Sequence, residues 1–504
     1  MSERSVCKTG PNDRQLEYHL SLLKLESQEE QLEENSLAPV FTSHVLSRCC
    51  DQSPSKPAGE ISQYGLLAGI TKASVSDSEV LNDRSTWEKD PRLFFNVSSP
   101  SSTFICGSQG SGKSHTLSCI LEGCLIPSKS GNLSSPLTAV VFHYDTFICD
   151  SGGSPCEAAF LASNSDIEIR VLCAPTNLRT IKGTYSRFNI KVEALKIDQA
   201  DLNTKRMLDL MAVGHNNGPL PLYMHTVQRI LREMRVEQQS RGTGFDYAGF
   251  KTRILVSGLT PGQLEPLKQR LDTLESFMPS KQAFPHIGAK VKAKRRGSDW
   301  TPRPSQLTIV DLSCPCISSD TACSLFNICL GIFLEQNTDV GRIVALDEAH
   351  KYMDSSVEAR SFTESLLSAV RLQRHLGVRI VISTQEPTIS TALLGLCSIT
   401  VVHRFSSPEW LRVLKHHIAA VAIGEDVSRE SSTHKECRSV SQKSLFDRIV
   451  RLRVGEALLF SPSAVIGTPA GSDMDGIVQK LGPGFLEVRV RSRLTEDGGR
   501  SVMA

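Results

Sequence analysis

One short stretch constrains the fold of this chain more than any other: the loop GSQGSGKS at residues 107–114. The apolar and β-branched residues 103–106 before it predict a strand, and residues 115–122 after it predict a helix. Glycines in this context let several backbone N–H groups converge on one centre, and the helix N-terminus adds partial positive charge. A chance glycine-rich turn seldom matches the full spacing, so we interpret the stretch as a phosphate-binding loop.

The residue types within this loop predict individual roles. Lys113 is expected to reach the β- and γ-phosphates of a nucleotide, and Ser114 is expected to ligate Mg²⁺. The residues expected to contact the nucleotide are Gly107, Ser108, Gln109, Gly110, Ser111, Gly112, Lys113, Ser114 and His115.

Composition sets broad limits on the protein. A chain of 504 residues with 40% hydrophobic residues is expected to form one large or two moderate domains. Its net charge of +2 gives no global basic field that would indicate nucleic-acid binding by itself. The 15 cysteines form no regular framework, and the pairs Cys49–Cys50 and Cys314–Cys316 favour buried free thiols over a metal site. With no signal peptide and no apolar run of membrane-spanning length, we expect an intracellular protein, cytoplasmic or nuclear, without membrane partners.

Composition and periodicity divide the chain into five parts. Residues 1–60 are predicted to be a mobile polar N-terminal tail, and residues 471–504 a C-terminal tail. Residues 61–185 and 306–470 are predicted to be the two parts of an ATPase core, separated by a mainly helical insertion at 186–305. Alternating strands and helices in the core predict an α/β fold with a central, mostly parallel sheet flanked by helices.

Several segments predict particular elements of this core. Strands are expected at 137–144, 167–173, 307–312, 342–346, 378–384 and 399–405, with 167–173 as an edge strand. Helices are expected at 223–238, 261–277, 321–335 and 357–376.

A basic run in the insertion has two interpretations. It contains Lys290, Lys292, Lys294, Arg295 and Arg296. Such a run is usually a solvated loop, but it is also the best local candidate for contacting the phosphates of a polynucleotide.

The segment RIVALDEAH at 342–350 indicates the reaction. Its apolar strand delivers Asp347 to the carboxyl edge of the sheet, where Asp347 is expected to hold Mg²⁺. The next residue, Glu348, is placed to orient and deprotonate a water in line with the γ-phosphate. The alternative is a solvent-facing acidic pair at a strand end, but the phosphate-binding loop upstream favours ATP hydrolysis.

Gln385 closes the strand predicted at 378–384. If that strand lies beside the Asp347 strand, Gln385 would point at the γ-phosphate and report its presence. The alternative is an ordinary polar residue at a strand end.

Taken together, these segments resemble the HerA–FtsK superfamily of P-loop ATPases, and most of all its HerA-like branch. The segments that carry the resemblance are GSQGSGKS at 107–114, LTIVDLS at 307–313, IVALDEAH at 343–350, VRLQRHLGVRIVISTQEP at 370–387 and LRVGEALLFSPSAV at 452–465.

The resemblance implies a RecA-like (ASCE) P-loop NTPase core with an extra strand between the Gly107 and Asp347 strands. It also implies ATP and Mg²⁺ as ligands, a homo-oligomer in the form of a hexameric ring, and duplex DNA as a partner. In such rings an arginine finger completes the neighbouring site, and the candidates are Arg371 and Arg374, with Arg404 behind them. The alternative for these arginines is salt bridging on a helix surface.

The sequence departs from the family at two places. The segment before Thr103 is short and mostly polar and does not predict the N-terminal β-barrel of HerA proteins. Asp145 stands where the family has an acidic residue, but Thr146–Cys149 replace the glycine–glutamate–tyrosine continuation.

Two hypotheses follow for the function. The first is Mg-dependent ATP hydrolysis coupled to DNA translocation or unwinding, as the resemblance implies. The second is a nucleotide-dependent switch or scaffold ATPase that does not move on DNA, which the near-neutral charge and missing barrel favour. The pair Asp347–Glu348 and Gln385 disfavour a kinase, because a kinase must exclude the water that Glu348 is placed to activate.

Overall fold

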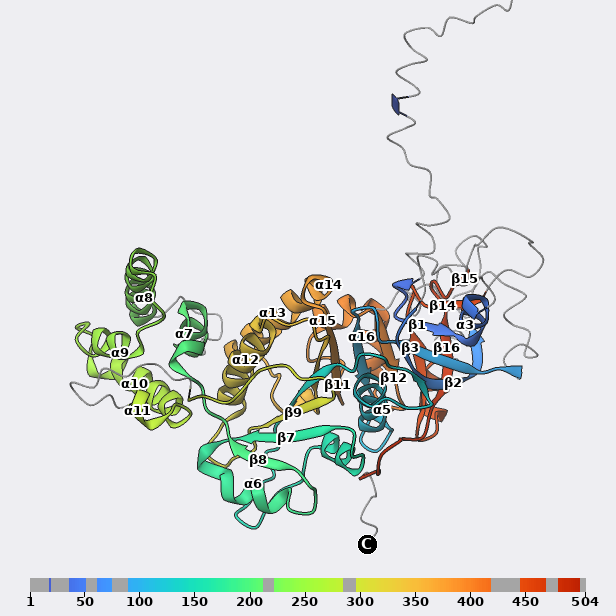
Figure 1. The fold of residues 1–504 in the computed structure, drawn as a ribbon, viewed down its shortest axis with the longest axis horizontal. Helices are drawn as coiled ribbons and strands as arrows, with labels where there is room; N and C mark the ends of the chain where they lie inside the picture. Colours follow the sequence, from blue (N-terminus) through green and yellow to red (C-terminus); the bar gives the residue numbers. More distant parts are fainter. Residues whose placement is uncertain are drawn as a thin grey trace, which may run out of the picture.

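The computed structural model describes residues 18–19, 36–50, 61–74, 89–211, 222–283, 296–417, 445–467 and 479–498. In this part of the chain one continuous sheet has the strand order β15-β14-β1-β3-β2-β16-β13-β12-β4-β11-β10-β6-β9-β7-β8, with β5 paired to β2. The sheet changes from parallel to mostly antiparallel pairing between β12 and β13. A group of helices extends beyond the parallel half, and the antiparallel half lies at the other end of the molecule (Figure 1).

The parallel half contains the phosphate-binding loop. Its strands, in spatial order, are β12 (Ile399–Val402), β4 (Ser102–Cys106), β11 (Val378–Thr384), β10 (Arg342–Leu346), β6 (Thr138–His143), β9 (Gln306–Asp311), β7 (Glu168–Cys173) and β8 (Lys191–Ala194). All of these strands pair in parallel. The structure therefore confirms the α/β fold and the extra strand, β11, between the loop strand β4 and the Asp347 strand β10.

Both faces of the parallel half are buried, which explains why its strands read as continuous apolar runs. Neighbouring residues such as Val141 and Phe142 belong to different hydrophobic clusters because successive side chains point to opposite faces. Helices α5 (Lys113–Leu125) and α6 (Leu178–Thr184), with the 3₁₀ segments η1 (Glu157–Ser163) and η2 (Pro175–Asn177), lie on one face. The other face packs against α12 (Ser319–Glu335), α13 (Val357–Arg371), α14 (Gln373–Leu376), α15 (Thr391–Leu396) and α16 (Pro408–His417).

The mostly antiparallel half joins segments from both ends of the chain. Its strands are β13 (Glu456–Phe460), β16 (Phe485–Val490), β2 (Tyr64–Ser74), β3 (Arg92–Asn96), β1 (Val40–Thr42), β14 (Val465–Gly467), β15 (Gln479–Lys480) and β5 (Gly131–Asn132). Helix α3 (Ser43–Cys50) follows β1. The N-terminal segment thus contributes strands to a sheet, although its sequence predicts no β-barrel.

Three features differ from the sequence-based expectations. Strand β1 lies inside the expected N-terminal tail, yet its Phe41 is fully buried against Phe94. Strand β16 lies inside the expected C-terminal tail, yet it pairs with both β13 and β2. Strand β7 was expected at an edge, which is wrong, because β8 covers it and occupies the edge of the described sheet. Each of these pairings depends on a partner that is distant in the chain or on a short strand, so local patterns did not reveal them.

Helices make up most of the described part of residues 186–305. After η3 (Gln199–Asp201) it contains α7 (Thr204–Met211), α8 (Leu222–Arg241), α9 (Tyr247–Leu255), α10 (Pro261–Ser276) and α11 (Ser280–Ala283). Arg270 of α10 forms a 2.8 Å ion pair with the buried Glu358 of α13, which ties the insertion to the core. Of the basic run, Lys290, Lys292, Lys294 and Arg295 lie outside the described residues, whereas the backbone N–H of Arg296 donates to Asp198.

The segment that follows β16 is held against the loop helix α5 by one buried carboxylate. Glu122 of α5 is fully buried and pairs with Arg491 at 2.7 Å. It also accepts hydrogen bonds from the backbone of Leu494 and from the backbone and hydroxyl of Thr495. Arg493, itself 2% exposed, lies 3.8 Å from the same carboxylate. This carboxylate therefore connects the end of the chain to the phosphate-binding loop.

Replacing Glu122 is expected to destabilise the fold. The variant Glu122→Ala leaves the buried guanidinium of Arg491 without its carboxylate, whereas Arg493 keeps its ion pair with Glu157. Loss of the Arg491 pair costs about 3–5 kcal/mol of unfolding free energy. Urea unfolding followed by circular dichroism measures this loss. Glu364→Ala, at an exposed position of α13, is the control and should change stability by less than about 0.5 kcal/mol. Equal effects of the two substitutions would contradict the assigned role of Glu122.

Candidate nucleotide-binding site

The loop between β4 and α5 has the backbone conformation that a phosphate cradle requires. Gly107 and Gly112 have φ values of 154° and 114°, which side chains rarely allow. A Cβ at Gly107 would also lie 2.7 Å from Cβ of His403. Gly112 caps the N-terminus of α5, so the free N–H groups of the helix begin at Lys113 and Ser114. The loop presents an anion-binding concavity at the carboxyl edge of the sheet.

Lys113 lies at the centre of the site. It is 3% exposed, and its Nζ donates to the carbonyl of Ser108 at 3.2 Å. The same ammonium lies 3.9 Å from a carboxylate oxygen of Glu348. Burial lowers the pKa of Lys113, and the nearby Glu348 and Asp347 oppose this shift. A positive group held in this low-dielectric site is suited to bind phosphate oxygens.

Glu348 and Gln385 meet beside Lys113. Gln385 follows β11, which pairs with the Asp347 strand β10, and its Nε2 donates to Glu348 at 3.2 Å and also contacts Gln109. The backbone of Glu348 has φ 48°, an uncommon left-handed conformation that clusters at functional sites. Burial, together with the charge of Asp347, raises the pKa of Glu348. The structure thus brings together the two residues that the sequence assigned to water activation and γ-phosphate sensing.

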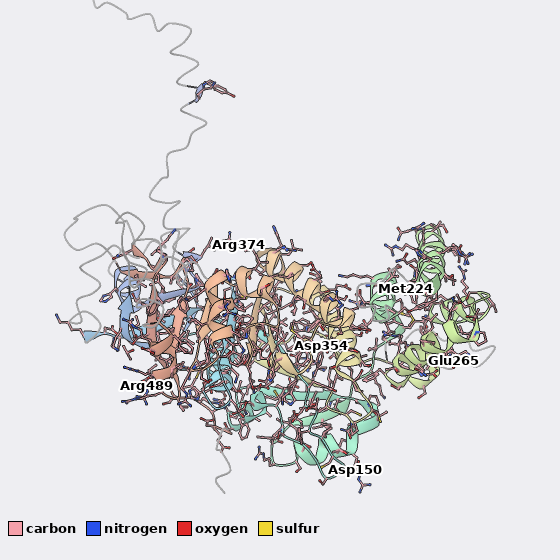
Figure 2. The ribbon with its side chains drawn as sticks, turned by 180° about the vertical axis from the view of Figure 1, so that it is seen from behind. Asp150, Met224, Glu265, Asp354, Arg374 and Arg489 are labelled. Atoms are coloured by element: carbon pink, nitrogen blue, oxygen red, sulfur yellow. The ribbon has the colours of Figure 1, made fainter. Side chains whose placement is uncertain are left out.

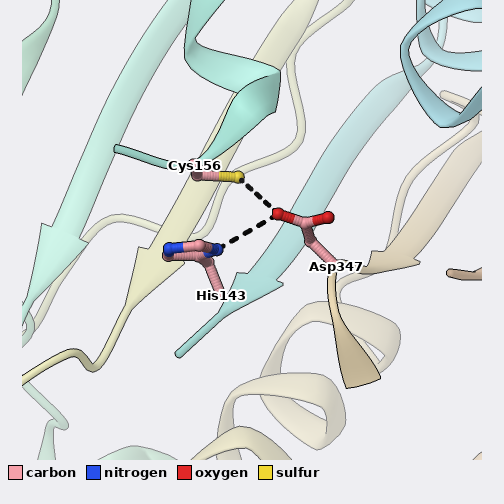
Figure 3. Close-up of side chains that lie close together, drawn as sticks. All are labelled: His143, Cys156 and Asp347. Carbon is pink, nitrogen blue, oxygen red and sulfur yellow. Dashed lines mark hydrogen bonds and ion pairs between the residues drawn. The ribbon is translucent and has the colours of Figure 1, made fainter. Parts of the chain in front are cut away.

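Asp347 is anchored through one of its two carboxylate oxygens. Strands β6 and β10 pair so that His143 lies beside Asp347, and Nδ1 of His143 lies 3.1 Å from Oδ2. The thiol of Cys156 lies 3.6 Å from the same oxygen (Figure 3). The second oxygen, Oδ1, is buried and has no hydrogen-bond partner among the described residues. An orphaned buried carboxylate oxygen at this position fits a metal ion such as Mg²⁺.

Two further neighbours complete the surroundings of the site. The side chain of Ser114 lines the same cavity as Lys113 and Glu348, as a ligand of Mg²⁺ beside the phosphates must do. The His350 ring accepts a hydrogen bond from the backbone N–H of Gln385 at 3.3 Å. Burial, with the nearby charge of Lys113, lowers the pKa of His350 to about 4, so its imidazole is neutral.

A cavity of about 740 Å³ opens from the loop. Its lining includes Lys113, Ser114 and Glu348 as well as Arg491 and Gly498. Its volume falls within the usual range for small-molecule sites. The candidate site is therefore built by the loop and by the segment that follows β16.

His403 packs directly against the phosphate-binding loop. It follows β12, is fully buried, and lies beside Gly107 because β12 pairs with β4. Its Nδ1 donates to the carbonyl of Glu456 at 3.0 Å, and its Nε2 lies 2.8 Å from the hydroxyl of Thr116. Burial lowers the pKa of His403 to about 4, so the ring is neutral.

Other predicted site residues lie farther from this centre. His115 contacts the segment after β16, with Nε2 2.7 Å from the carbonyl of Arg491. Arg371 and Arg374 are exposed at the end of α13 and in α14, at the opposite end of β11 from Gln385 (Figure 2 labels Arg374). Asp145 pairs with Lys351 at 3.2 Å. The arginines therefore do not approach the site within one chain.

Sequence reasoning missed His143, Cys156 and His403. His143 and His403 each stand at the carboxyl end of an apolar strand, and this position was the available signal. Cys156 stands in a segment without strand character, and only its packing reveals it.

Comparisons with known proteins gave structural matches only. No family model and no curated protein matches the chain. The solved structure of VirB4 from Thermoanaerobacter pseudethanolicus is similar at 11% identity and TM-score 0.48, covering 85% of this chain and 96% of that one. The plasmid coupling protein TrwB, in complex with an ATP analogue, is similar at 12% identity and TM-score 0.40, covering 89% and 97%. B204, the DNA-packaging ATPase of Sulfolobus turreted icosahedral virus, is similar at 11% identity and TM-score 0.29, covering 72% and 93%.

The order of the strands in the parallel half identifies the fold. The order β12-β4-β11-β10-β6 places the loop strand β4 one strand away from the Asp347 strand β10, with β11 between them. The chain has a RecA-like P-loop NTPase fold. None of the helices in the described ranges combines the length and the hydropathy needed to cross a lipid bilayer.

The buried His403 is expected to make stability depend on pH. Folding lowers the pKa of His403 from 6.5 to about 4. Between these two pH values the ring is protonated in the unfolded chain and neutral in the folded chain. The contribution of the neutral His403 ring to the free energy of unfolding is therefore fully present above pH 6.5. It is lost as the pH falls toward 4, by up to about 3 kcal/mol. Urea unfolding between pH 7.5 and pH 4.5 should show a smaller loss for His403→Asn than for the unchanged protein. Parallel curves for the two proteins would refute this assignment.

Proposed function

We propose that this protein is a Mg-dependent ATPase that couples ATP hydrolysis to translocation or unwinding of DNA. The observation that carries the ATPase proposal is the arrangement around Glu348, which lines one cavity with Lys113, accepts a hydrogen bond from Gln385 and directly follows Asp347. These residues come from the ends of two neighbouring parallel strands, β10 and β11, and from helix α5, and each has the chemistry that its place requires.

The protein contributes positioning and charge to the proposed reaction. The loop N–H groups and Lys113 hold the β- and γ-phosphates, and Ser114 and Asp347 hold Mg²⁺, whose charge offsets that of the phosphates. Glu348 accepts a proton from the attacking water, and its raised pKa suits a general base. Gln385, already bonded to Glu348, transmits the presence of the γ-phosphate to that base.

The coupling to DNA rests on the resemblance to HerA-like motors and on the basic run. In this proposal Lys290, Lys292 and Lys294 contact DNA phosphates, and the chain acts as a homo-oligomer, with a hexameric ring as the implied form. The exposure of Arg371 and Arg374 supports a role in trans, since both are accessible to a neighbouring subunit.

The catalytic base is tested by Glu348→Gln. The amide cannot accept the proton of water, so turnover should fall at least about 100-fold while ATP binding changes little. Phosphate release and calorimetric titration with ATP measure the two quantities. Lys113→Ala should instead lose binding, and Glu364→Gln, at an exposed position of α13, should keep both. Unchanged ATP turnover in Glu348→Gln would contradict the proposed mechanism.

Duplex DNA is expected to stimulate turnover, and DNA affinity should weaken steeply with salt. Replacing Lys290, Lys292 and Lys294 by Gln should reduce the slope of log affinity against log salt by up to about 3, since each phosphate contact contributes about 0.9. Fluorescence anisotropy at several salt concentrations measures this slope. The control replaces three exposed lysines elsewhere, Lys182, Lys191 and Lys205.

The oligomeric state completes this test. Light scattering with and without ATP should detect a multimer. A monomer whose ATP turnover does not change when duplex DNA is added would contradict translocation and favour the switch or scaffold function.

A further inference from the structure

Three different metal-ligating side chains converge beneath the nucleotide site. Nδ1 of His143, Sγ of Cys156 and a carboxylate oxygen of Asp347 all lie within 4.8 Å of one another. All three residues are buried, and they come from the ends of two neighbouring strands and from the residue before η1 (Figure 3). Local sequence patterns do not reveal this cluster, because the three residues are separated by up to 204 positions.

The spacing of these atoms matches a tetrahedral metal site. Zinc bound to nitrogen, sulfur and oxygen at its usual bond lengths places nitrogen and oxygen about 3.4 Å apart, and sulfur and oxygen about 3.6 Å apart. The corresponding separations to Oδ2 of Asp347 are 3.1 Å for His143 and 3.6 Å for Cys156. The two separations to Asp347 therefore fit shared coordination of one ion, and all three ligand atoms lie within 4.8 Å of one another.

The position of Cys156 is fixed by hydrogen bonds. Its backbone N–H donates to the hydroxyl of Tyr185 at 2.9 Å, and that hydroxyl donates to Asp311 at 2.7 Å. Asp311 is in turn the register partner of His143 in the adjoining strand. Because outer hydrogen bonds of this kind orient metal ligands, the thiol and the imidazole are held toward the same point.

The kind of metal follows from the donor atoms. A thiolate, an imidazole and a carboxylate together suit Zn²⁺, whereas Mg²⁺ prefers oxygen ligands alone. Three protein ligands leave one position open, as in zinc sites that bind water. Pro155 and Glu157, on either side of Cys156, line the nucleotide cavity, so the segment that carries Cys156 borders this cavity.

We propose that His143, Cys156 and Asp347 form a Zn²⁺ site, and that zinc bound to Oδ2 of Asp347 places a second divalent charge beside Oδ1, which weakens Mg²⁺ binding there and inhibits ATP hydrolysis. The inhibitory part rests on the proposed ATPase function, whereas zinc binding does not. Binding releases the proton of the Cys156 thiol and requires the Nδ1 atom of His143 to be free of its proton. The site therefore couples the availability of zinc to the nucleotide site.

Metal binding is tested without nucleotide on the full-length protein. After chelation, a competing zinc indicator should report one tight Zn²⁺ per chain. Co²⁺ as a spectroscopic probe should give a thiolate-to-cobalt absorption band that Cys156→Ser lacks. Cys156→Ser and His143→Gln should each weaken Zn²⁺ binding at least about tenfold. Cys173→Ser, a buried thiol on β7 that donates to Glu193, is the matched control and should keep both signals.

The outcomes of this experiment are decisive for the site. No thiolate-to-cobalt band in the unchanged protein, or equal Zn²⁺ affinity in Cys156→Ser, overturns the proposal. If Cys156→Ser does not fold, as judged by circular dichroism, His143→Gln and the cobalt spectrum of the unchanged protein still decide it.

Inhibition is tested separately on turnover. Zn²⁺ in the presence of excess Mg²⁺ should inhibit the unchanged protein and Cys173→Ser at concentrations at least about tenfold lower than those that inhibit Cys156→Ser, and a chelator should reverse the effect. Zinc that binds at the cluster but leaves turnover unchanged overturns the inhibitory role. A protein that binds cobalt through Cys156 but lacks turnover refutes the ATPase proposal and not the site.

Discussion

The parallel register of β12, β4, β11, β10 and β6 is the constraint on which the site depends. It sets His403 beside Gly107, Gln385 beside Glu348, and His143 beside Asp347. A shift of one residue in any of these pairings would turn its side chains to the other face of the sheet. The two buried faces prevent such a shift, because it would exchange the residues that pack against α5 with those that pack against α12 and α13. Hydrophobic packing thus fixes the positions of the polar side chains at the carboxyl edge of the parallel sheet.

The same packing places several charges in a region of low dielectric. Lys113, Asp347 and Glu348 balance one another across short distances, and burial is the largest influence on the pKa of each. Burial raises the pKa of Glu348 and lowers that of Lys113, so both shifts bring the pair toward neutrality. Phosphate oxygens would compete with Glu348 for Lys113, since both offer negative oxygen to the same ammonium. Displacement of Glu348 from Lys113 would then free the carboxylate for its proposed role as a base, which would link binding to catalysis.

The sequence predicted the parts of this site that local patterns encode. The loop at 107–114 and the strands that deliver Asp347 and Gln385 were placed to within one or two residues, because glycine spacing and apolar runs are local signals. His143, Cys156 and His403 were not predicted, since their importance comes from register and packing between distant segments. Strands β1 and β16 were missed for a related reason. Strand β1 is short, and both strands pair with segments far away in the chain, so neither periodicity nor composition distinguished them from tails.

Strand β16, which the sequence did not predict, leads into the segment that Glu122 holds against the loop helix. Because Glu122 belongs to the helix that begins at Lys113, its bonds to Arg491 and Thr495 fix the far end of the loop helix to the segment after β16. That segment also lines the nucleotide cavity through Arg491 and Gly498. A nucleotide that moved α5 would strain these buried bonds, and a partner that moved β16 would alter the cavity. The antiparallel half of the sheet is therefore connected to the helix of the phosphate-binding loop by the buried contacts of Glu122.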